Sequence, residues 1–428
     1  MLASQEQYED VDVIVVGGGP AGRWLAALLV RRSVSVILVD PRPGRIWPNR
    51  YGVFVDEVEG LELPVDLARS WSAPVVRFGT GKGSAGAQQV LGDAYGQIDN
   101  SAFQARLDRL VDAGGARRLA AKAKHVKRQG HLAVLTMVDG TTLRARLIVD
   151  ASGGAAQLAD YEAGGSAGFQ TAFGLCARVA GDPLKGASMV LMDLEAPFGE
   201  GFGDGERPSF LYGMRHGDDT YFLEETVLVG RPAVSVDILR RRLHRRLHAC
   251  GVVVKERIEE ERCQIPMGTA LPKRQQQTLA FGAAAGYVHP ATGYQLARTL
   301  RIGPAVAEVI ADGIGRRQST RLIAERGHEV MWPPSMRRAH RMLCVGMETL
   351  LGLDGPEMSQ FFERFFSLPK QDWRAYMSGE ATPGRLAAIM WRLFRGAPMA
   401  LQIALGRRAL RSHHMLRKAL IPGGPAYG

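Results

Sequence analysis

Two adjacent glutamates, Glu224 and Glu225, lie within the short apolar run FLEET at residues 222–226. The run has a strand-like composition, and neighbouring residues of a strand point to opposite faces, so only one of the two carboxyl groups can face a given cavity. Burial in an apolar pocket disfavours the charged form of a carboxyl group, which raises its pKa and suits it to donate a proton. The same pattern is also compatible with solvated acids on an edge strand, or with a buried ion pair to one of the many arginines.

A glycine-rich motif near the start of the chain is suited to a dinucleotide. Residues 11–16 (VDVIVV) have the composition of a buried parallel strand, residues 17–22 (GGGPAG) follow, and residues 23–32 have helical spacing of apolar side chains. Glycines in such a turn let the backbone approach a pyrophosphate at the helix N-terminus. A second strand-like run, residues 33–39, ends at an acid that can accept a hydrogen bond from a ribose hydroxyl. The predicted cofactor contacts are Gly17, Gly19, Pro20, Ala21, Gly22 and Asp40.

The position of this motif at the extreme N-terminal side of the chain favours FAD over NAD. No second motif of this kind occurs, so no separate nicotinamide domain is expected. A predicted strand at residues 143–149 ends in Asp150, Ser152 and Gly153, and small residues there would again let the backbone approach a cofactor. A plain turn at the end of a strand explains that stretch equally well.

A loop at residues 283–293 (AAAGYVHPATG) leads into a predicted helix at residues 294–313. The partial positive charge of a helix N-terminus in this place could face the pyrimidine ring of a flavin and favour its anionic reduced form. His289 of this loop is a candidate catalytic residue, although a lone loop histidine is more often structural or exposed. The further cofactor contacts predicted from this stretch are Gly286, Pro290, Thr292, Gly293 and Tyr294.

The order of the predicted elements indicates an interrupted nucleotide-binding domain. We expect residues 9–186 to form its first part, with an inserted loop at residues 51–97. Residues 187–265 alternate strand-like runs with loops and are expected to form an antiparallel sheet domain that binds the substrate. Residues 266–315 are expected to return to the nucleotide-binding domain. From residue 316 to 428 the pattern is helical, and this part is predicted to be a basic region that touches a membrane surface.

Within the sheet region, strands are predicted at residues 209–214, 220–228 and 263–266, with an Arg-rich helix at residues 236–248. A basic helical run is predicted at residues 385–420. After Glu380 the chain contains no acidic residue and eight basic ones, namely Arg385, Arg392, Arg395, Arg407, Arg408, Arg411, Arg417 and Lys418.

The uneven charge restricts the class of protein. The chain has 428 residues and a formal net charge of +11, with 46% hydrophobic and 23% charged residues, which is ordinary globular composition rather than that of a disordered chain. Most of the excess charge lies in the basic tail, so a nucleic-acid binder, which is basic throughout, is not expected. A basic tail with apolar residues between the charges is instead typical of a segment that lies on anionic lipid.

The cysteines and the N-terminus limit metal sites and location. Cys176, Cys250, Cys263 and Cys344 are scattered, with no CxxC pair or Cys/His cluster, so we expect neither a disulfide framework nor a metal site. Residues 1–13 lack a basic n-region and are acidic where a transit peptide would be Arg-rich. No stretch of about 18 apolar residues offers a spanning helix. We therefore predict a peripheral protein on the cytoplasmic face of a bacterial membrane.

Several segments together resemble the plant and cyanobacterial lycopene cyclase family, over roughly residues 9–395. They are IWPNRYGVFVDE at 46–57, FLEET at 222–226, ERCQIPMG at 261–268 and VHPATGYQLARTL at 288–300, followed by residues 361–369 and 371–373 in the helical part. FLEET followed by VHPATGY is quite specific among flavoproteins. Two segments depart from the family pattern, Met192-Asp193-Leu194-Glu195 and Gly153-Gly154-Ala155-Ala156, and these departures leave the ring type and the preferred substrate open.

The resemblance implies an α/β (α+β) fold, with a Rossmann-like FAD-binding domain of the glutathione-reductase and aromatic-hydroxylase type. An inserted antiparallel-sheet substrate domain and a helical C-terminal region complete that fold. It also implies a lycopene beta-cyclase that forms β-rings from the ψ-ends of lycopene without net redox change, using reduced FAD with NAD(P)H as the distal reductant. Glu224 is then the best acid/base candidate, with Glu225 beside it, and His289 shapes the flavin site or joins proton transfer.

The partners implied are lycopene or a related acyclic carotene, an anionic membrane surface and other carotenoid-pathway enzymes. Alternatives remain open. They are a redox flavoenzyme of the same fold (a monooxygenase or prenyl-chain reductase), a cyclase with an ε-ring or ketocarotenoid product, and a non-catalytic carotenoid- or flavin-binding protein.

Overall fold

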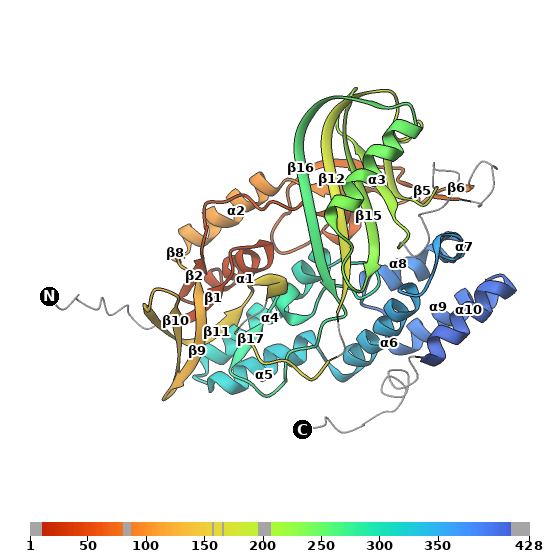
Figure 1. Ribbon diagram of the computed structural model, residues 1–428. Helices are drawn as coiled ribbons and strands as arrows, with labels where there is room; N and C mark the ends of the chain where they lie inside the picture. The colour runs from red at the N-terminus through yellow and green to blue at the C-terminus, as the bar shows by residue number, and fades with distance from the viewer. Residues whose placement is uncertain (1–10, 80–86, 156–157, 165–166, 196–206, 412–428) are drawn as a thin grey trace.

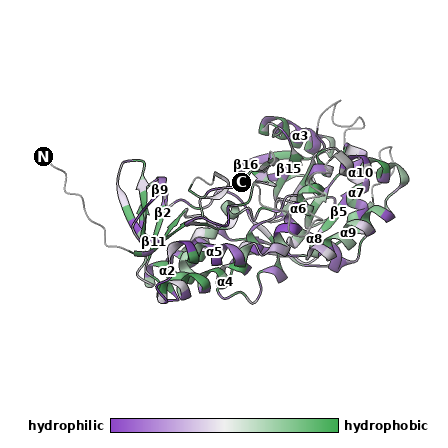
Figure 2. Ribbon diagram, turned by 90° about the horizontal axis from the view of Figure 1, so that it is seen from below, coloured by the Kyte–Doolittle hydropathy of each residue, from purple (hydrophilic) through white to green (hydrophobic). Residues whose placement is uncertain are grey.

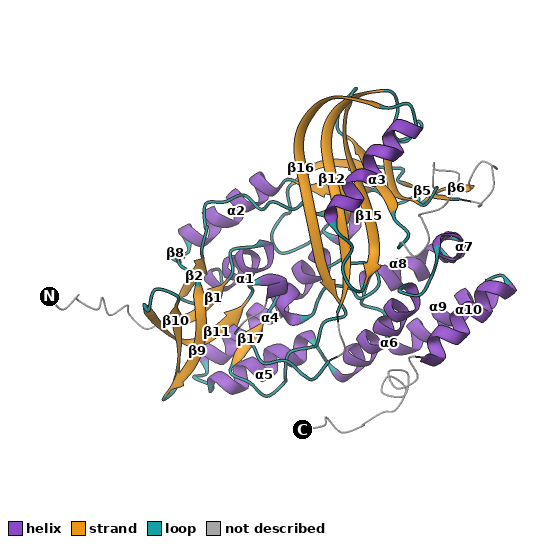
Figure 3. Cartoon of the chain, viewed as in Figure 1, coloured by secondary structure: helices purple, strands orange, loops and turns teal. Residues whose placement is uncertain are grey.

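The computed structural model describes residues 11–79, 87–155, 158–164, 167–195 and 207–411. Two large sheets and a group of C-terminal helices follow one another along an elongated molecule (Figure 1). Figure 3 shows that helices dominate the C-terminal third and that strands dominate the middle of the chain. The predicted fold class, an α/β nucleotide-binding domain with an inserted sheet and a helical C-terminal region, is confirmed.

The first sheet is built around the N-terminal strand. Its strands run in the order β8 (Arg117–Ala120), β2 (Val36–Asp40), β1 (Val11–Val16), β11 (Thr142–Asp150), β10 (Leu132–Met137) and β9 (Ala123–Gln129), with β17 (Thr278–Ala280) beside β11. The strands β8, β2, β1, β11 and β17 are parallel, whereas β9 and β10 continue the sheet as an antiparallel hairpin. Because β1 alternates its side chains between the two faces, Val13 and Val15 pack against helices while Ile14 and Val16 pack on the opposite side.

Four helices accompany the first sheet and bury a shared apolar core. They are α1 (Pro20–Val30), α2 (Asn100–Ala113), α4 (Leu296–Gly315) and α5 (Thr320–Met331). Trp24 of α1 is completely buried, and its indole nitrogen donates to the carbonyl oxygen of Leu300 in α4 at 3.0 Å. The later segment of the chain, β17 and α4, therefore packs with β1 and α1 in the same sheet and core.

The second sheet is larger than the predicted one. Its strands run in the order β16 (Val253–Met267), β12 (Gly168–Ala180), β15 (Thr220–Gly230), β14 (Phe210–Arg215), β13 (Met189–Asp193), β5 (Val75–Phe78) and β6 (Ala87–Val90). Helix α3 (Val236–Ala249) packs against β12 and β15 on one face of this sheet. Neighbouring strands are antiparallel except for the parallel pair of β5 and β13.

Two predicted boundaries differ from the structure. We expected the sheet to begin at residue 187, but β12 already belongs to it. This strand could not be recognised in the sequence, because it is buried on both faces over most of its length and lacks the alternation that marks a half-buried strand. We expected an inserted loop at residues 51–97. This segment instead contributes β5 and β6 and a small sheet of β3 (Gly52–Phe54), β7 (Tyr95–Ile98) and β4 (Leu67–Trp71).

The helical region packs its apolar faces against the second sheet. It consists of α6 (Pro334–Leu350), α7 (Gly355–Phe366), α8 (Lys370–Ser378), α9 (Pro383–Gly396) and α10 (Met399–Arg411), and short 3-10 turns occur at Val55–Glu57, Gly153–Ala155 and Gly282–Ala285. The helices show purple and green stretches in alternation in Figure 2, as amphipathic helices do. The predicted basic run is divided at Pro398, since proline lacks the amide hydrogen that a continuous helix needs. Arg417 and Lys418 lie outside the described residues.

Candidate functional site

A cavity of about 690 Å³ lies where the second sheet, the small sheet, the loop before α4 and the helical region meet. Its sheet wall includes Phe222, Glu224, Thr226 and Leu228 of β15, which alternate along the strand and therefore share one face. The odd-numbered residues Leu223 and Val227 pack instead into the apolar core under α3. The alternation of β15 thus decides which of the two glutamates reaches the cavity.

Glu224 faces the cavity from the middle of β15. The hydroxyl of Thr226 donates to its Oε1 at 2.8 Å. Burial, followed by the nearby negative charge of Glu261, raises the pKa of Glu224 to about 8, although Thr226 and Arg50 act in the opposite direction. The side chain keeps some exposed area because it borders the cavity, but the surrounding protein removes it from bulk water. A carboxyl group in this state is protonated at neutral pH and can act as a general acid.

Glu225 points to the other face of the sheet and does not line the cavity. Its carboxylate accepts hydrogen bonds from Arg246 of α3 at 2.8 and 3.0 Å and from the hydroxyl of Ser209 at 2.6 Å, and the whole side chain is buried. This corrects the assignment of Glu225 as a catalytic residue. The buried ion pair that the sequence left open applies to Glu225, while the raised-pKa acid applies to Glu224.

His289 is buried beside the cavity but does not line it. Its Nδ1 accepts a hydrogen bond from the amide of Ala291 at 3.2 Å, so Nε2 carries the proton and donates to the carbonyl oxygen of Tyr376 at 2.9 Å. Burial and the charge of Arg298 lower the pKa of His289 to about 3, and the ring is neutral. One ring nitrogen therefore bonds within the loop before α4, and the other joins that loop to α8. This corrects the assignment of His289 as a catalytic residue: it is a positioning residue.

The glycine motif has the geometry that a pyrophosphate requires. Gly17 has φ +110°, and a Cβ on it would lie 2.3 Å from the carbonyl oxygen of Ala151; a Cβ on Gly22 would lie 1.9 Å from the carbonyl oxygen of Gly17. Gly19 is the N-cap of α1, with no side-chain cap, and the space where its Cβ would be contains no atom within 4 Å. The helix N-terminus, with Pro20 and Ala21 in its first turn, thus opens onto unfilled space that an anion would occupy.

Asp40, Asp150 and Ser152 shape the backbone around this end of the site. Asp40 accepts hydrogen bonds from the amides of Gly18 and Arg42, both at 2.7 Å, which ties the glycine turn to the end of β2. Asp150 is completely buried, and its two oxygens accept from Ser152 and from the amides of Leu158 and Ala159. Asp150 and Ser152 therefore position their loop for a cofactor, while the polar atoms of Asp150 are occupied within the protein.

Some of the cofactor contacts predicted in the following loops line the cavity, and others are buried without lining it. Gly153, Thr292, Gly293 and Tyr294 line the cavity, together with Gln295, the uncapped N-cap of α4. The N-terminus of α4 therefore opens onto the cavity. Gly286 and Pro290 are buried and are not among the lining residues; a Cβ on Gly286 would lie 2.7 Å from Leu271, so this glycine is required for packing.

These features fit FAD. The open N-terminus of α1 and Asp40 at the end of β2 lie beside the loop after β11, since a Cβ on Gly17 would meet Ala151 of that loop, and Gly153 of the same loop lines the cavity together with Gly293. Gly17, Gly19 and Gly22 with the first turn of α1 would hold the pyrophosphate, and the N-terminus of α4 would lie beside the flavin end.

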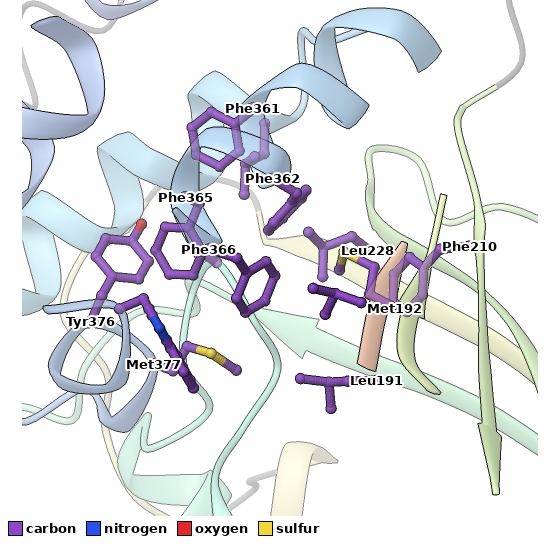
Figure 4. Packing of buried hydrophobic residues seen from close by; sticks show 14 of the residues in the cluster. Leu191, Met192, Phe210, Leu228, Phe361, Phe362, Phe365, Phe366, Tyr376 and Met377 are labelled. Atoms are coloured by element: carbon purple, nitrogen blue, oxygen red, sulfur yellow. The ribbon is translucent and has the colours of Figure 1, made fainter. Parts of the chain in front are cut away.

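A wall of aromatic side chains closes the cavity on the helical side. Figure 4 shows phenylalanines of α7 directed toward apolar side chains of the second sheet, with Tyr376 and Met377 of α8 beside them. The lining residues of this wall are Phe361, Phe362, Phe365, Phe366, Tyr376 and Met377, and those opposite are Leu191, Met192, Phe210 and Leu228. The cavity is thus apolar over most of its surface, with Glu224 among its polar groups.

Sequence reasoning missed Glu261 and Arg50 as residues of the cavity. Both lie in segments that carry the family resemblance, residues 261–268 and 46–57, so a signal was present, but no spacing in the sequence places either of them near Glu224. Within the described residues, no group of His, Cys, Asp and Glu side chains could hold a metal ion, and no helix is long and apolar enough to cross a membrane.

The chain was compared with known proteins. It is 38% identical to the chromoplastic capsanthin/capsorubin synthase of Citrus sinensis, a match that covers 90% of this chain and 77% of that protein. It is 34% identical to the chloroplastic lycopene beta cyclase of an Oncidium hybrid cultivar, over 92% of this chain and 83% of that protein. These relatives are plastid proteins of plants, so the predicted location on the cytoplasmic face of a bacterial membrane is wrong.

Solved structures share the fold at low identity. A geranylgeranyl bacteriochlorophyll reductase-like protein of Thermoplasma acidophilum has a TM-score of 0.66 and 15% identity, covering 90% of this chain and 99% of that one. A variant of the halogenase PltM in complex with FAD has a TM-score of 0.61 and 12% identity, covering 96% of each chain. These likenesses establish an FAD-binding fold. The family model described as "Lycopene cyclase protein" matches residues 12–403, and the chain therefore belongs to the lycopene cyclase family.

Proposed function

We propose that this protein is a lycopene beta-cyclase that closes β-rings at the ψ-ends of lycopene. The observation that carries the proposal is Glu224, a carboxyl group whose raised pKa of about 8 keeps it protonated in the wall of a cavity lined mainly by apolar and aromatic side chains. Protonation of an alkene needs an acid that stays neutral in a dry pocket, and the hydrocarbon substrate needs apolar walls.

The reaction balances with Glu224 as both acid and base. Its proton is added to C2 of the terminal C1=C2 double bond, which leaves a tertiary cation at C1. The C5=C6 π bond attacks C1, forms the C1–C6 bond and moves the cation to C5. Loss of the C6 proton to the Glu224 carboxylate then forms the C5=C6 double bond of a β-ring, whereas loss of the C4 proton would give an ε-ring. The acid is regenerated and no electrons are gained or lost.

Protein groups around the cavity can stabilise the cation and exclude water. The side chains of Tyr212 and Phe210 line the cavity together with Glu224, and aromatic rings attract cations. The apolar helical wall keeps out the water that would otherwise capture the cation as an alcohol. Fixed negative charge near the developing cation contributes in the same direction, as preorganised charge generally does.

The redox state of the cofactor is part of the proposal. Bound FAD in its anionic reduced form would supply negative charge beside the cavity, and the open N-terminus of α4 favours such a charge. NAD(P)H is the expected reductant and would act from solution, since the sequence contains no second dinucleotide motif.

The test is an anaerobic incubation of the protein with FAD, NADPH and lycopene in liposomes. We expect γ-carotene and then β-carotene, with NADPH used in catalytic rather than stoichiometric amounts. Because the protonated form of Glu224 is the active acid, kcat/KM should be flat below its pKa and fall about tenfold per pH unit above pH 8. Stoichiometric NADPH use with a reduced or hydroxylated product would favour a redox enzyme of the same fold, and δ- or ε-carotene would change the ring type. An epoxy-carotenoid supplied in place of lycopene tests for a ketocarotenoid product.

Contact with a lipid membrane is the second part of the proposal, because lycopene has to be taken from a bilayer. The apolar residues of the tail divide into two sets: Leu393, Leu401 and Leu405 are buried in the core, whereas Trp391 and Met399 are exposed by 58% and 72%. Ile403 is also exposed, by 49%. An exposed apolar residue followed by arginine one helical turn later occurs twice, at Trp391 with Arg395 and at Ile403 with Arg407.

The exposed residues Trp391, Met399 and Ile403 are expected to insert into the interface of anionic lipid. Arg392 and Arg408 are held by Asp372 and Glu357, so less of the tail charge is available than its composition suggests. We therefore expect apolar contacts to contribute most of the membrane affinity.

Replacing Trp391 or Met399 by glutamate is expected to weaken binding to anionic liposomes by roughly ten- to a hundredfold for each residue, since each apolar side chain would lose about 1.5–3 kcal/mol of burial. Liposome sedimentation measures the effect. Val138, which is also 58% exposed but lies in the turn after β10, is the matched control, and its replacement by glutamate should leave sedimentation unchanged. Equal losses in all three variants would contradict a docking surface on α9 and α10.

A further inference from the structure

We propose that Glu261, held in place by Arg50, is a positioning residue that works as a pair with Glu224, keeping the proton on Glu224 and holding negative charge beside the cavity. The inference rests on the proposed function for its catalytic meaning. It names a residue for which neither the comparisons nor the sequence patterns provide a role.

The strand register brings the two carboxyl groups to the same place in the sheet. Strand β12 lies between β15 and β16, and Gly174 of β12 pairs with Glu224 on one side and with Glu261 on the other. Residues two strands apart are separated by roughly 10 Å of backbone, and two glutamate side chains that lean toward the middle strand cover much of that distance. Both residues line the cavity, which places them on the same face of the sheet.

The residue between them has no side chain. A Cβ on Gly174 would lie 2.7 Å from the ring of Phe222 and 3.3 Å from Cβ of Glu261. The absence of a side chain at this position therefore lets the Phe222 ring lie over β12. The guanidinium of Arg50 lies 4.6 Å from the centre of that ring, and Phe222 in this way supports the cation that binds Glu261.

Arg50 fixes the orientation of the Glu261 carboxylate. The backbone amide of Arg50 donates to Oε1 at 3.0 Å, and its Nη1 donates to Oε2 at 3.2 Å. The Glu261 side chain is 5% exposed, so this arrangement is buried. The same guanidinium also binds Glu259 through Nη2. One arginine is thus shared by two carboxylates, of which Glu261 lines the cavity and Glu259 does not.

Several groups face Glu224 from the surrounding elements, and among them Glu261 is the source of negative charge. They are Glu261 and Cys263 from β16, Arg50 from the segment before β3, Tyr212 from β14 and Thr226 from its own strand. Burial raises the pKa of Cys263 to about 12 and that of Tyr212 well above its usual value, so both are neutral. Among these groups, Glu261 favours the protonated form of Glu224 and Arg50 opposes it.

The chemical consequence concerns both halves of the cyclisation. Before protonation, the negative charge of Glu261 favours the neutral form of Glu224 and extends the pH range in which the acid can act. After protonation, the same charge lies beside a cavity that holds a carbocation. A neutral residue in place of Glu261 would weaken both effects while leaving the acid itself in place.

The test compares Glu261→Gln with Glu259→Gln, a matched control that removes the same charge from the same arginine on the same strand. The pH dependence of kcat/KM for cyclisation is measured, together with the infrared carbonyl band of the protonated Glu224 carboxyl, which is assigned by its loss in Glu224→Gln. In Glu261→Gln we expect the alkaline limb of both titrations to move roughly one pH unit lower, with about tenfold lost activity at pH 9 and little loss at pH 6. Glu259→Gln should keep both titrations of the unmodified protein. Glu261→Asp, which retains the charge on a shorter side chain, should keep most of the activity on the alkaline side, so that the alkaline limb moves only partway.

The pairing of Glu261 with Glu224 would be overturned if the alkaline limb of both the kcat/KM profile and the infrared titration stayed unchanged, or if activity fell equally at every pH. A residue with a merely structural role does not change the pH at which Glu224 titrates. If Glu261→Gln does not fold, Glu261→Asp decides the matter by the same two titrations, since its shorter side chain should displace the limb partway. An infrared shift in a protein that forms no cyclic product under any condition would overturn the proposed function and leave the carboxyl pair intact.

Discussion

Replacement of Glu224 by glutamine is expected to reduce lycopene cyclisation by about 10²- to 10⁴-fold, the usual contribution of a general acid. Glutamine has nearly the same size and keeps an oxygen that can accept from the Thr226 hydroxyl, but it has no proton of sufficient acidity to add to an alkene. The measurement is product chromatography after anaerobic turnover of lycopene in liposomes.

The control for this variant is cofactor retention. The glycine motif and the N-terminus of α4 belong to other elements than β15, so FAD should stay bound, as measured by its absorbance after gel filtration. Glu224→Asp, which keeps the acid but withdraws it from the cavity, should have intermediate activity. Continued formation of β-carotene by Glu224→Gln at the normal rate would remove Glu224 from the mechanism.

Replacement of Glu225 by alanine is expected to lower the free energy of unfolding by about 3–5 kcal/mol, the cost of breaking a buried ion pair on one side. Arg246 is 4% exposed in its side chain, and without Glu225 it would keep its charge among apolar residues of the second sheet and α3. Urea denaturation followed by circular dichroism measures the loss. The same experiment on Glu224→Gln should show no loss and, at neutral pH, a gain in stability, because folding raises the pKa of Glu224 to about 8 and the folded protein must then bind a proton that glutamine does not need.

A double variant separates the ion pair from other effects of the substitution. Glu225→Leu combined with Arg246→Met removes both charges and should recover most of the lost stability, because a well-packed apolar pair often replaces a buried ion pair without cost. A stable Glu225→Ala protein that binds FAD but has lost its activity would instead return Glu225 to the chemistry of the site.

The nucleotide-binding part could be predicted in detail because its signals are local. The strand at Val11–Val16, the glycine turn and helix α1 follow one another without interruption, and a Cβ on Gly22 would meet the carbonyl oxygen of Gly17 only five residues earlier. The predicted strand at residues 143–149 and the predicted helix at residues 236–248 also agree with β11 and α3 to within one residue at each end. Periodicity and turn chemistry suffice for such elements.

The substrate cavity could not be assembled in this way. Its sheet wall depends on β12, whose burial on both faces removes the alternation that reveals a strand, and the second sheet is completed by β5 and β6 from a segment read as a loop. Its opposite wall consists of aromatic residues of α7 and α8, which are more than a hundred residues away from Glu224 in the chain. Pairing over such distances leaves no periodic trace in the sequence.

The sequence by itself determined that a dinucleotide is bound, that an acid pair lies in an apolar strand, and that excess positive charge is confined to the tail, because composition and short-range spacing carry these properties. Tertiary structure alone decided which of the two carboxyl groups reaches the cavity. The face of β15 that meets the cavity is set by the register with β12 and β14, and that register turns Glu224 toward Glu261 and Glu225 toward Arg246. His289 also depends on neighbours that only folding brings together. Burial and the charge of Arg298 lower its pKa, and its neutral ring donates to Tyr376 and so joins the loop before α4 to α8.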